Sequence, residues 1–507
     1  MQKFISNIRN IYLRDKRYIW VSILVPFIFY ILYGYTHVSA DGYIMLDNPQ
    51  AYTPYEFVKV NGRFGLDIFL GIMHILNFYP VENQLFFTAL ACLILSINIY
   101  LIYYFIKQIV KKNTHVDRLL FLATITLFCN VFYTDWIVWT ETVCFTFIPA
   151  ALCGLLSGKV LLSQKGNKIF NYFLSALLLI LGFGFYQTSG VYFYLVCTIF
   201  MLGDYLEGHS IKKFFITLIK AITIFCYAAG SQLIISKIYS LQRANYSQVD
   251  IMNNIKNILH SSLWTTTLNA LPKYTYILFL LSGIISLIYV ILKLKRVNKT
   301  CVSLIIILNF IGIVAITFLP HVIGNQFWMV WRTTTGFILL PGWLYIMAGI
   351  LCQAEKKEDF KLNNFKFKVC GLIIIIYLGI NYYQTQQVIL GNHITNRLDR
   401  QETLYFYNEI LEYEKETGME VNKLAFTGDE NYKWAYDNVF SFGDINVRAA
   451  HVEWCVLPMY NYYTNRKFLQ SEIPEEIKKK MFAAKNWDEL NKQQIYIEDD
   501  TAYICIY

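Results

Sequence analysis

The sequence predicts a polytopic α-helical membrane protein that ends in a small α/β domain. Of its 507 residues, 56% are hydrophobic and only 16% are charged. The apolar residues lie in long runs, most of them of about 16 to 23 residues, which is long enough for a helix to cross ~30 Å of hydrocarbon. These runs stop near Gln384, where the composition changes to that of a soluble domain. We therefore expect a membrane core over residues 1–384 and a soluble domain over residues 385–507.

A basic N-terminus precedes the first span. Its positively charged residues are Lys3, Arg9, Arg14, Lys16 and Arg17. The apolar run from Tyr18 to about Tyr35 then predicts a membrane-spanning helix. Because Lys and Arg accumulate in cytoplasmic segments, we expect the N-terminus to lie in the cytoplasm. The formal net charge of +9 reflects similar clusters at the ends of apolar runs, so it does not indicate binding to nucleic acid.

Further apolar runs predict the remaining spans, which gives about eleven in total. They cover roughly 84–106, 118–133, 139–160, 170–187, 191–204, 214–236, 275–293, 301–319, 333–352 and 369–384. The loops that this order places in the cytoplasm are rich in Lys and Arg, whereas the opposite loops hold few. This asymmetry supports the assignment of the loops, and an odd number of spans puts the C-terminal domain on the outer side.

Residues 37–83 form the first long polar stretch between two spans. Its apolar run, Leu66 to Tyr79, has to be a surface or re-entrant helix, because a complete crossing there would invert every later loop. Three carboxylates that precede Arg63 in this stretch are candidates for proton transfer: Asp41, Asp47 and Glu56. We interpret it as the catalytic outer loop of a membrane enzyme.

A second outer segment brings two more carboxylates to the membrane surface. Asp135 lies between Thr134 and Trp136, and Glu141 lies one turn into the next span. A carboxylate within or beside a span is energetically unfavourable unless it faces a wet cavity or a partner, which makes Glu141 a functional candidate. Asp135 fits equally well a functional site or the ordinary interfacial belt of aromatic and charged residues.

Two arginines and a glutamine in the outer segments are candidates for substrate binding. Arg63 and Arg332 present several donors that suit phosphate oxygens, and a guanidinium stays protonated at working pH. Each arginine is equally consistent with a structural role, in which its side chain extends from a helix end to the membrane surface. Gln187 suits either a hydrogen bond to a sugar hydroxyl or the capping of a tight outer connection.

The C-terminal domain has local patterns of both helix and strand. Asn396–Glu416 has helical periodicity, Lys423–Phe426 is typical of a strand, and Pro474 suits the start of a helix. Gln494–Ile506 predicts two strands around a turn at Glu498–Thr501.

The cysteines divide between the two parts of the chain. Nine of the 11 lie in or beside apolar runs, and only Cys455 and Cys505 lie in the polar domain. Because the space outside a cell membrane is usually oxidising, we expect these two to form a disulfide. No zinc-type spacing of Cys or His occurs, so the sequence predicts no metal site, and a need for a divalent cation stays open.

Taken in order, these features resemble the bacterial serotype-converting O-antigen glucosyltransferases. The shared features are the basic start, the single span, the acidic outer loop with Asn61-Gly62-Arg63-Phe64, the short helical run, the outer Tyr186-Gln187-Thr188 connection and the outer C-terminal domain. The resemblance covers essentially the whole chain, and it rests on the order of the motifs.

The resemblance implies a GT-C-like glycosyltransferase of the bacterial inner membrane, with a cytoplasmic N-terminus and a periplasmic C-terminal domain. Its donor would be undecaprenyl phosphate glucose, and its acceptor would be lipid-linked O-antigen, whose repeat units are glucosylated in serotype conversion. A lipid-linked donor agrees with the lack of a glycine-rich nucleotide loop in the sequence. Membrane lipids complete the expected partners.

In that class an acidic residue of the first outer loop is the expected catalytic group, and Asp41 is the best-placed match. Asp41 would take the acceptor proton, while Arg63 and Arg332 would stabilise the phosphate. The class implies a single displacement with inversion. The paired-acid motif of related enzymes is missing as a clean Asp-x-Asp, so Asp47 and Glu56 stay open as alternatives.

A transporter or flippase for lipid-linked sugars is the main alternative, and an O-antigen polymerase or acyltransferase is a third. Transporters usually place ionisable residues near the middle of their spans and show repeated halves. This chain gathers its charges in outer loops and carries an additional outer domain, which favours the glucosyltransferase.

Overall fold

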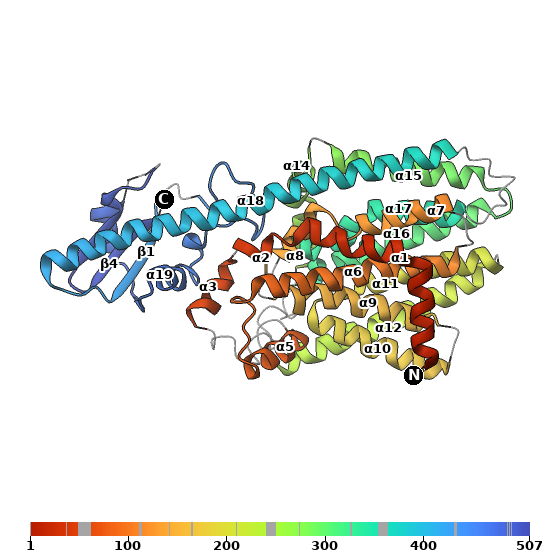
Figure 1. The fold of residues 1–507 in the computed structure, drawn as a ribbon, viewed down its shortest axis with the longest axis horizontal. Helices are drawn as coiled ribbons and strands as arrows, with labels where there is room; N and C mark the ends of the chain where they lie inside the picture. Colours follow the sequence, from red (N-terminus) through yellow and green to blue (C-terminus); the bar gives the residue numbers. More distant parts are fainter. Residues whose placement is uncertain are drawn as a thin grey trace.

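The computed structural model describes residues 2–36, 38–48, 62–110, 114–140, 142–163, 166–208, 210–239, 250–272, 274–324, 327–352, 364–429, 433–483, 485, 487 and 489–506. The molecule is elongated, with a helix bundle at one end and a small domain with a β-sheet at the other (Figure 1). The helix α18 (Asn364–Thr417) runs along both parts and joins them. We call the end of the bundle next to the small domain the domain end, and the opposite end the far end.

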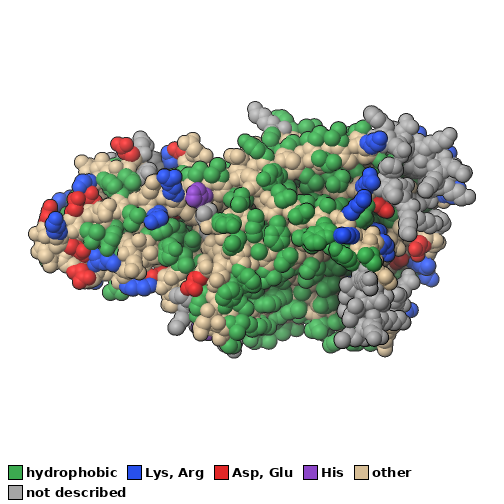
Figure 2. Space-filling view, in the orientation of Figure 1, with side chains coloured by type: hydrophobic (Ala, Val, Ile, Leu, Met, Phe, Trp, Pro, Cys, Tyr) green, Lys and Arg blue, Asp and Glu red, His purple; other side chains and the backbone are tan. Residues whose placement is uncertain are grey.

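Ten helices among the described residues are long and apolar enough to cross a membrane, or eleven if a bent N-terminal pair counts as one span. Besides α18, the bundle contains α1 (Gln2–Tyr30), α2 (Tyr33–Thr36), α6 (Gln84–Ile109), α7 (Thr114–Thr126), α9 (Phe147–Leu161), α10 (Lys168–Phe185), α11 (Ser189–Gly208), α12 (Ile211–Ile238), α15 (Thr275–Lys293), α16 (Lys299–Ile323) and α17 (Thr335–Cys352). The predicted class, a polytopic α-helical membrane protein with a C-terminal domain, is confirmed. Hydrophobic side chains cover most of the visible bundle surface (Figure 2).

Between the long helices, several short elements gather at the domain end. They are α3 (Ala40–Asp47), α5 (Phe64–Ile75), η1 (Val131–Tyr133), α8 (Thr134–Ile137), η2 (Val143–Phe145), α13 (Ile251–Leu259), α14 (Ser262–Asn269) and η4 (Trp331–Thr333). The elements η1, α8 and η2 interrupt the chain between α7 and α9, so polar groups such as Asp135 are held there by local turns.

The short helix α5 covers most of the apolar run Leu66 to Tyr79, for which the charge pattern predicted a surface or re-entrant helix. It has 12 residues, fewer than a crossing requires. It packs on α10, where Gly65 lies so close to Phe185 that an added Cβ would be 2.7 Å from the ring. The helix therefore lies tightly against the bundle, while Ile68 and Ile72 remain exposed.

An ion pair joins α1 to α6 near the far end of the bundle. The carboxylate of Asp15 is fully buried, and Lys107 donates to it at 2.5 Å. Arg14 donates to the same carboxylate at 2.9 Å and Tyr100 at 3.1 Å. Because removal of one partner from a buried pair leaves an uncompensated charge, this contact holds the N-terminal helix in place.

We expect Asp15→Leu to destabilise the protein by about 3 kcal/mol, because Lys107 then lies half-buried without its carboxylate. The double variant Asp15→Leu/Lys107→Met should recover most of the lost stability. Thermal unfolding in detergent measures both effects in a double-mutant cycle. Equal stability of the single and double variants would contradict a coupled pair.

The C-terminal domain is built on a four-stranded sheet of order β2-β1-β4-β3. Its strands are β1 (Lys423–Gly428), β2 (Leu469–Gln470), β3 (Ile495–Glu498) and β4 (Thr501–Ile506). β1 is parallel to β2 and β4, while β3 and β4 form an antiparallel hairpin. The predicted strand at Lys423 and the predicted hairpin are thus confirmed, with Asp499 in the left-handed region at the turn.

Helices cover both faces of this sheet. The second half of α18 and helix α19 (Val456–Thr464) pack on one face, in a cluster that contains Phe406, Met459 and Ile504. Short helices α20 (Glu475–Ile477) and η6 (Lys478–Phe482) lie with the other face, where Phe482 contacts the cluster of Tyr503 and Cys505. The remaining elements are η5 (Ala449–His451) and η7 (Lys492–Gln494). The predicted helix over Asn396–Glu416 exists as part of α18, and Pro474 caps α20 as expected.

The structure corrects the prediction of a disulfide between Cys455 and Cys505, since both are buried thiols that are not joined. Successive residues of a strand point to opposite faces of a sheet. On β4, Ile504 belongs to the α19 face and Cys505 to the opposite face. Cys455 directly precedes α19, so the sheet separates the two cysteines.

Candidate active site

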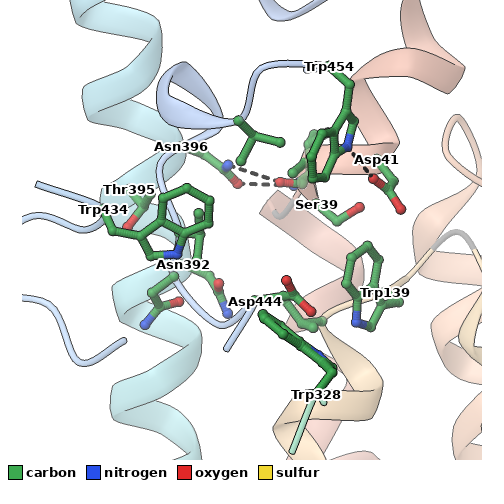
Figure 3. A pocket seen from close by; sticks show the side chains of 16 residues that line it. Ser39, Asp41, Trp139, Trp328, Asn392, Thr395, Asn396, Trp434, Asp444 and Trp454 are labelled. Atoms are coloured by element: carbon green, nitrogen blue, oxygen red, sulfur yellow. Dashed lines mark hydrogen bonds between the residues drawn. The ribbon is translucent and has the colours of Figure 1, made fainter. Parts of the chain in front are cut away.

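A cavity of about 380 Å³ lies where the bundle meets the C-terminal domain. It is lined by Val38, Ser39, Ala40, Asp41, Val138, Trp139, Trp328, Asn392, Thr395, Asn396, Trp434, Asp444, Asn446, Val447, Val452 and Trp454. Figure 3 shows these side chains around the cavity, with contributions from α3, α18 and the loops of the domain. Its volume lies within the ~300 to 1,000 Å³ that is usual for small-molecule sites.

The C-terminal domain holds the segment 38–48, which contains α3, at this cavity. Tyr43 of α3 is completely buried in the cluster of the domain, and its hydroxyl lies 2.6 Å from that of Tyr463. On the other side, Asn396 of α18 accepts from the Val38 amide and donates to the Val38 carbonyl, each at 3.0 Å. The segment that carries Asp41 is therefore fixed between α18 and the domain.

Asp41 is one of two carboxylates in the cavity wall. It lies in the first turn of α3, whose N-cap Ser39 accepts from the Gly42 amide at 2.9 Å. The indole of Trp454 donates to Asp41 Oδ1 at 3.1 Å (Figure 3). A donor to the carboxylate and a helix N-terminus both favour its ionised form, which is the form that accepts a proton.

Asp444 is the second carboxylate of the cavity, and it is ion-paired with Arg332. Arg332 also donates to Asp135, from its backbone amide at 2.8 Å and from Nη1 at 2.6 Å. Asp135 is completely buried, whereas the Asp444 side chain is 28% exposed. One guanidinium thus joins a buried carboxylate of the bundle to an accessible carboxylate of the domain.

Aromatic rings surround the two predicted phosphate-binding arginines. The Arg332 guanidinium lies 5.4 Å from the Trp139 ring centre, and that of Arg63 lies 4.8 Å from the Tyr186 ring centre. Burial lowers the pKa of Arg332, but Asp135, Asp444 and Tyr186 outweigh it and raise that pKa above its usual value. Arg332 therefore stays charged.

The structure brings together three of the predicted site residues, Asp41, Asp135 and Arg332, in or directly behind the cavity wall. Arg63 lies next to Tyr186, outside the lining. Asp47 lies at the other end of α3, where it pairs with Lys467 and accepts from Asn461 at 3.3 Å. Asp47 therefore does not line the cavity.

Three more predicted residues remain: Gln187, Glu56 and Glu141. Gln187 is exposed in the turn before α11 and does not line the cavity. Glu56 and Glu141 lie outside the described residues. In the part of the chain that is described, no group of three or more His, Cys, Asp or Glu is placed to hold a metal ion.

Sequence reasoning missed several residues of the cavity, above all Asp444 and the tryptophans Trp139, Trp434 and Trp454. Large exposed aromatic residues in a polar domain are a signal for a binding surface. The exposure of Trp434 and Trp454 is known from the structure, and the signal that the sequence offered was their place in a polar domain. Asp444 had none, because its importance comes from its pairing with Arg332, 112 residues away.

The apolar helices and the cavity at the end of the bundle define a polytopic membrane protein with a site for a small molecule. The family model of glucosyl transferase GtrII matches residues 40–341, more than half of the chain. The protein belongs to this glucosyltransferase family, which confirms the resemblance. No curated protein and no solved structure matches the chain.

Proposed function

We propose that the protein transfers glucose from a polyprenyl phosphate donor, undecaprenyl phosphate glucose, to O-antigen repeat units on the periplasmic side of the bacterial inner membrane. The observation that carries this proposal is the cavity at the domain end, where Asp41 lies close to indole rings and to the buried Arg332 network. Membership in the glucosyltransferase family favours transfer over transport or polymerisation.

The reaction needs a proton acceptor and a stabilised phosphate leaving group. In the proposed mechanism, Asp41 accepts the proton of an acceptor hydroxyl, whose oxygen bonds to C1 of glucose as the bond from C1 to the phosphate oxygen breaks. The phosphate leaves on the lipid with its negative charge. An attack from the face opposite the phosphate inverts the configuration at C1.

Arg332 is the proposed partner of the donor phosphate. Its Nη1 and backbone amide are used by the fully buried Asp135, whereas Nη2 pairs with the more exposed Asp444. An incoming phosphate would therefore replace Asp444 and leave the Asp135 contact intact. Arg63, whose guanidinium lies 4.8 Å from the Tyr186 ring centre, is the second proposed partner of the same phosphate.

The proposed orientation is supported by the positions of lysines at the helix ends. Lys107 and Lys159 lie in the last turns of α6 and α9, and Lys293 in the last turn of α15. Lys168 and Lys299 begin α10 and α16. These ends lie away from the C-terminal domain (Figure 1). Because Lys and Arg accumulate on the cytoplasmic side of a membrane, this arrangement supports the proposal of a periplasmic domain.

We expect a periplasmic phosphatase to be active when it is fused after Ile506 and inactive when it is fused after Lys361, because only the first fusion is exported. Phosphatase activity, normalised to the amount of fusion protein in membranes, measures the difference. A cytoplasmic reporter at the same two positions is the control, and it should give the opposite pattern. The reverse result with both reporters would contradict the orientation.

The direct test uses the purified full-length protein with labelled undecaprenyl phosphate glucose and lipid-linked O-antigen. Transfer of label to the acceptor would support the proposal. A sugar nucleotide supplied in place of the lipid donor is the control and should give no product. Transfer from the sugar nucleotide alone would overturn the assignment of the donor.

A further inference from the structure

The two sides of the cavity come from different parts of the chain. Asp41, Trp139 and Trp328 belong to the part that the GtrII family model matches. Trp434, Asp444 and Trp454 belong to the C-terminal domain, beyond residue 341 where the match ends. The family match therefore accounts for one wall and leaves the wall from the domain without an assigned role.

The wall from the domain presents two large indole rings. Trp434 is 44% exposed and Trp454 is 62% exposed, although both rings offer much apolar surface that a stable domain would otherwise bury. The flat apolar face of an indole suits the C–H face of a pyranose ring, and its N–H suits an oxygen acceptor. Carbohydrate is therefore the ligand class that fits these side chains.

This wall is held rigidly against α18. The Trp434 carbonyl accepts from the Arg448 amide at 3.2 Å. The Arg448 side chain, 1% exposed, is ion-paired with Glu402 of α18. Asn446, in the left-handed region at φ 57°, donates to the Phe440 carbonyl at 2.7 Å. A preorganised wall of this kind loses little freedom when it binds a ligand.

The wall that the C-terminal domain contributes also contacts Asp41, the proposed base. Trp454 donates to Asp41 at 3.1 Å although the two residues are 413 positions apart in the chain. Figure 3 shows Trp454 above Asp41 and Trp434 on the opposite side of the cavity. A sugar ring bound between them would have hydroxyl groups within reach of the Asp41 carboxylate.

We propose that Trp434 and Trp454 form the acceptor subsite of the enzyme. A pyranose residue of the acceptor polysaccharide stacks on these rings and turns one hydroxyl toward Asp41. The C-terminal domain thereby selects the acceptor, while the matched bundle carries out the transfer. This inference rests on the proposed function and deepens it.

The test is Trp434→Ala, because Trp434 contributes to the wall without the contact to Asp41 that Trp454 makes. We expect the KM for the acceptor to rise on the order of tenfold, while kcat and the KM for the donor stay unchanged. Trp434→Phe should keep most of the acceptor affinity, since it retains a flat ring. Trp20→Ala removes a tryptophan of similar exposure, 48%, from α1 and is the matched control.

The outcomes separate this inference from the proposed function. An unchanged acceptor KM in Trp434→Ala, in protein that transfers glucose normally, would overturn the acceptor subsite alone. A raised donor KM with an unchanged acceptor KM would overturn it too and assign the wall to the donor. A wild-type protein that transfers no glucose from the lipid donor would overturn the proposed function instead. The elution volume in size-exclusion chromatography and the thermal unfolding curve show whether each variant is folded.

Discussion

Asp41→Asn is expected to lower the rate of glucose transfer by ~10² to 10⁴, the usual effect of losing a general base. The substitution preserves the size of the side chain, and the amide oxygen of Asn can still accept from Trp454 Nε1, which donates to Asp41 at 3.1 Å. The start of α3 should therefore keep its structure. The measurement is transfer of labelled glucose per amount of folded protein in the membrane.

The same helix offers a matched control for this variant. Asp47→Asn removes a carboxylate that pairs with Lys467, a side chain that is 71% exposed, so little stability depends on the pair. We expect Asp47→Asn to transfer glucose at nearly the wild-type rate. Glu56→Gln tests the third candidate carboxylate of the loop. If Asp41→Asn transfers glucose at the normal rate and either of the other two variants loses transfer, the residue changed in that variant is the base instead.

The second large effect is expected at Arg332. Arg332→Gln leaves Asp135 completely buried without its positive partner, and breaking such a pair typically costs about 3 to 5 kcal/mol. We therefore expect both a lower amount of folded protein and a loss of glucose transfer. Membrane abundance and thermal unfolding measure the first effect, and the transfer assay measures the second.

A double variant separates these two roles of Arg332. Asp135→Asn/Arg332→Gln removes both buried charges, so the amount of folded protein should recover. Transfer should stay low, because no guanidinium is then available for the donor phosphate. Recovery of both properties would show that Arg332 serves the fold alone. Asp444→Asn is the companion control, since it removes only the exposed partner of Arg332 and should leave the protein folded.

The sequence alone determined most of the architecture, because the signals for it are local. The length of the apolar runs predicted the spans, and the hairpin of β3 and β4 followed from alternation around a polar turn. The position of Asp41 directly after the first span, together with the resemblance to the family, selected it as a candidate, and it does line the cavity.

Other features depended on contacts between distant parts of the chain, so only the tertiary structure decided them. Asp41 and Asp47 lie in one short helix, yet Asp41 lines the cavity and Asp47 pairs with Lys467, because the domain covers α3. Arg332 contacts Asp135 over 197 residues. Helix α18 joins the C-terminal domain to the bundle. At this junction Trp434 and Trp454 of the domain line the cavity together with Asp41. The same packing places Cys455 and Cys505 on opposite sides of the sheet, a separation that cysteine spacing does not encode.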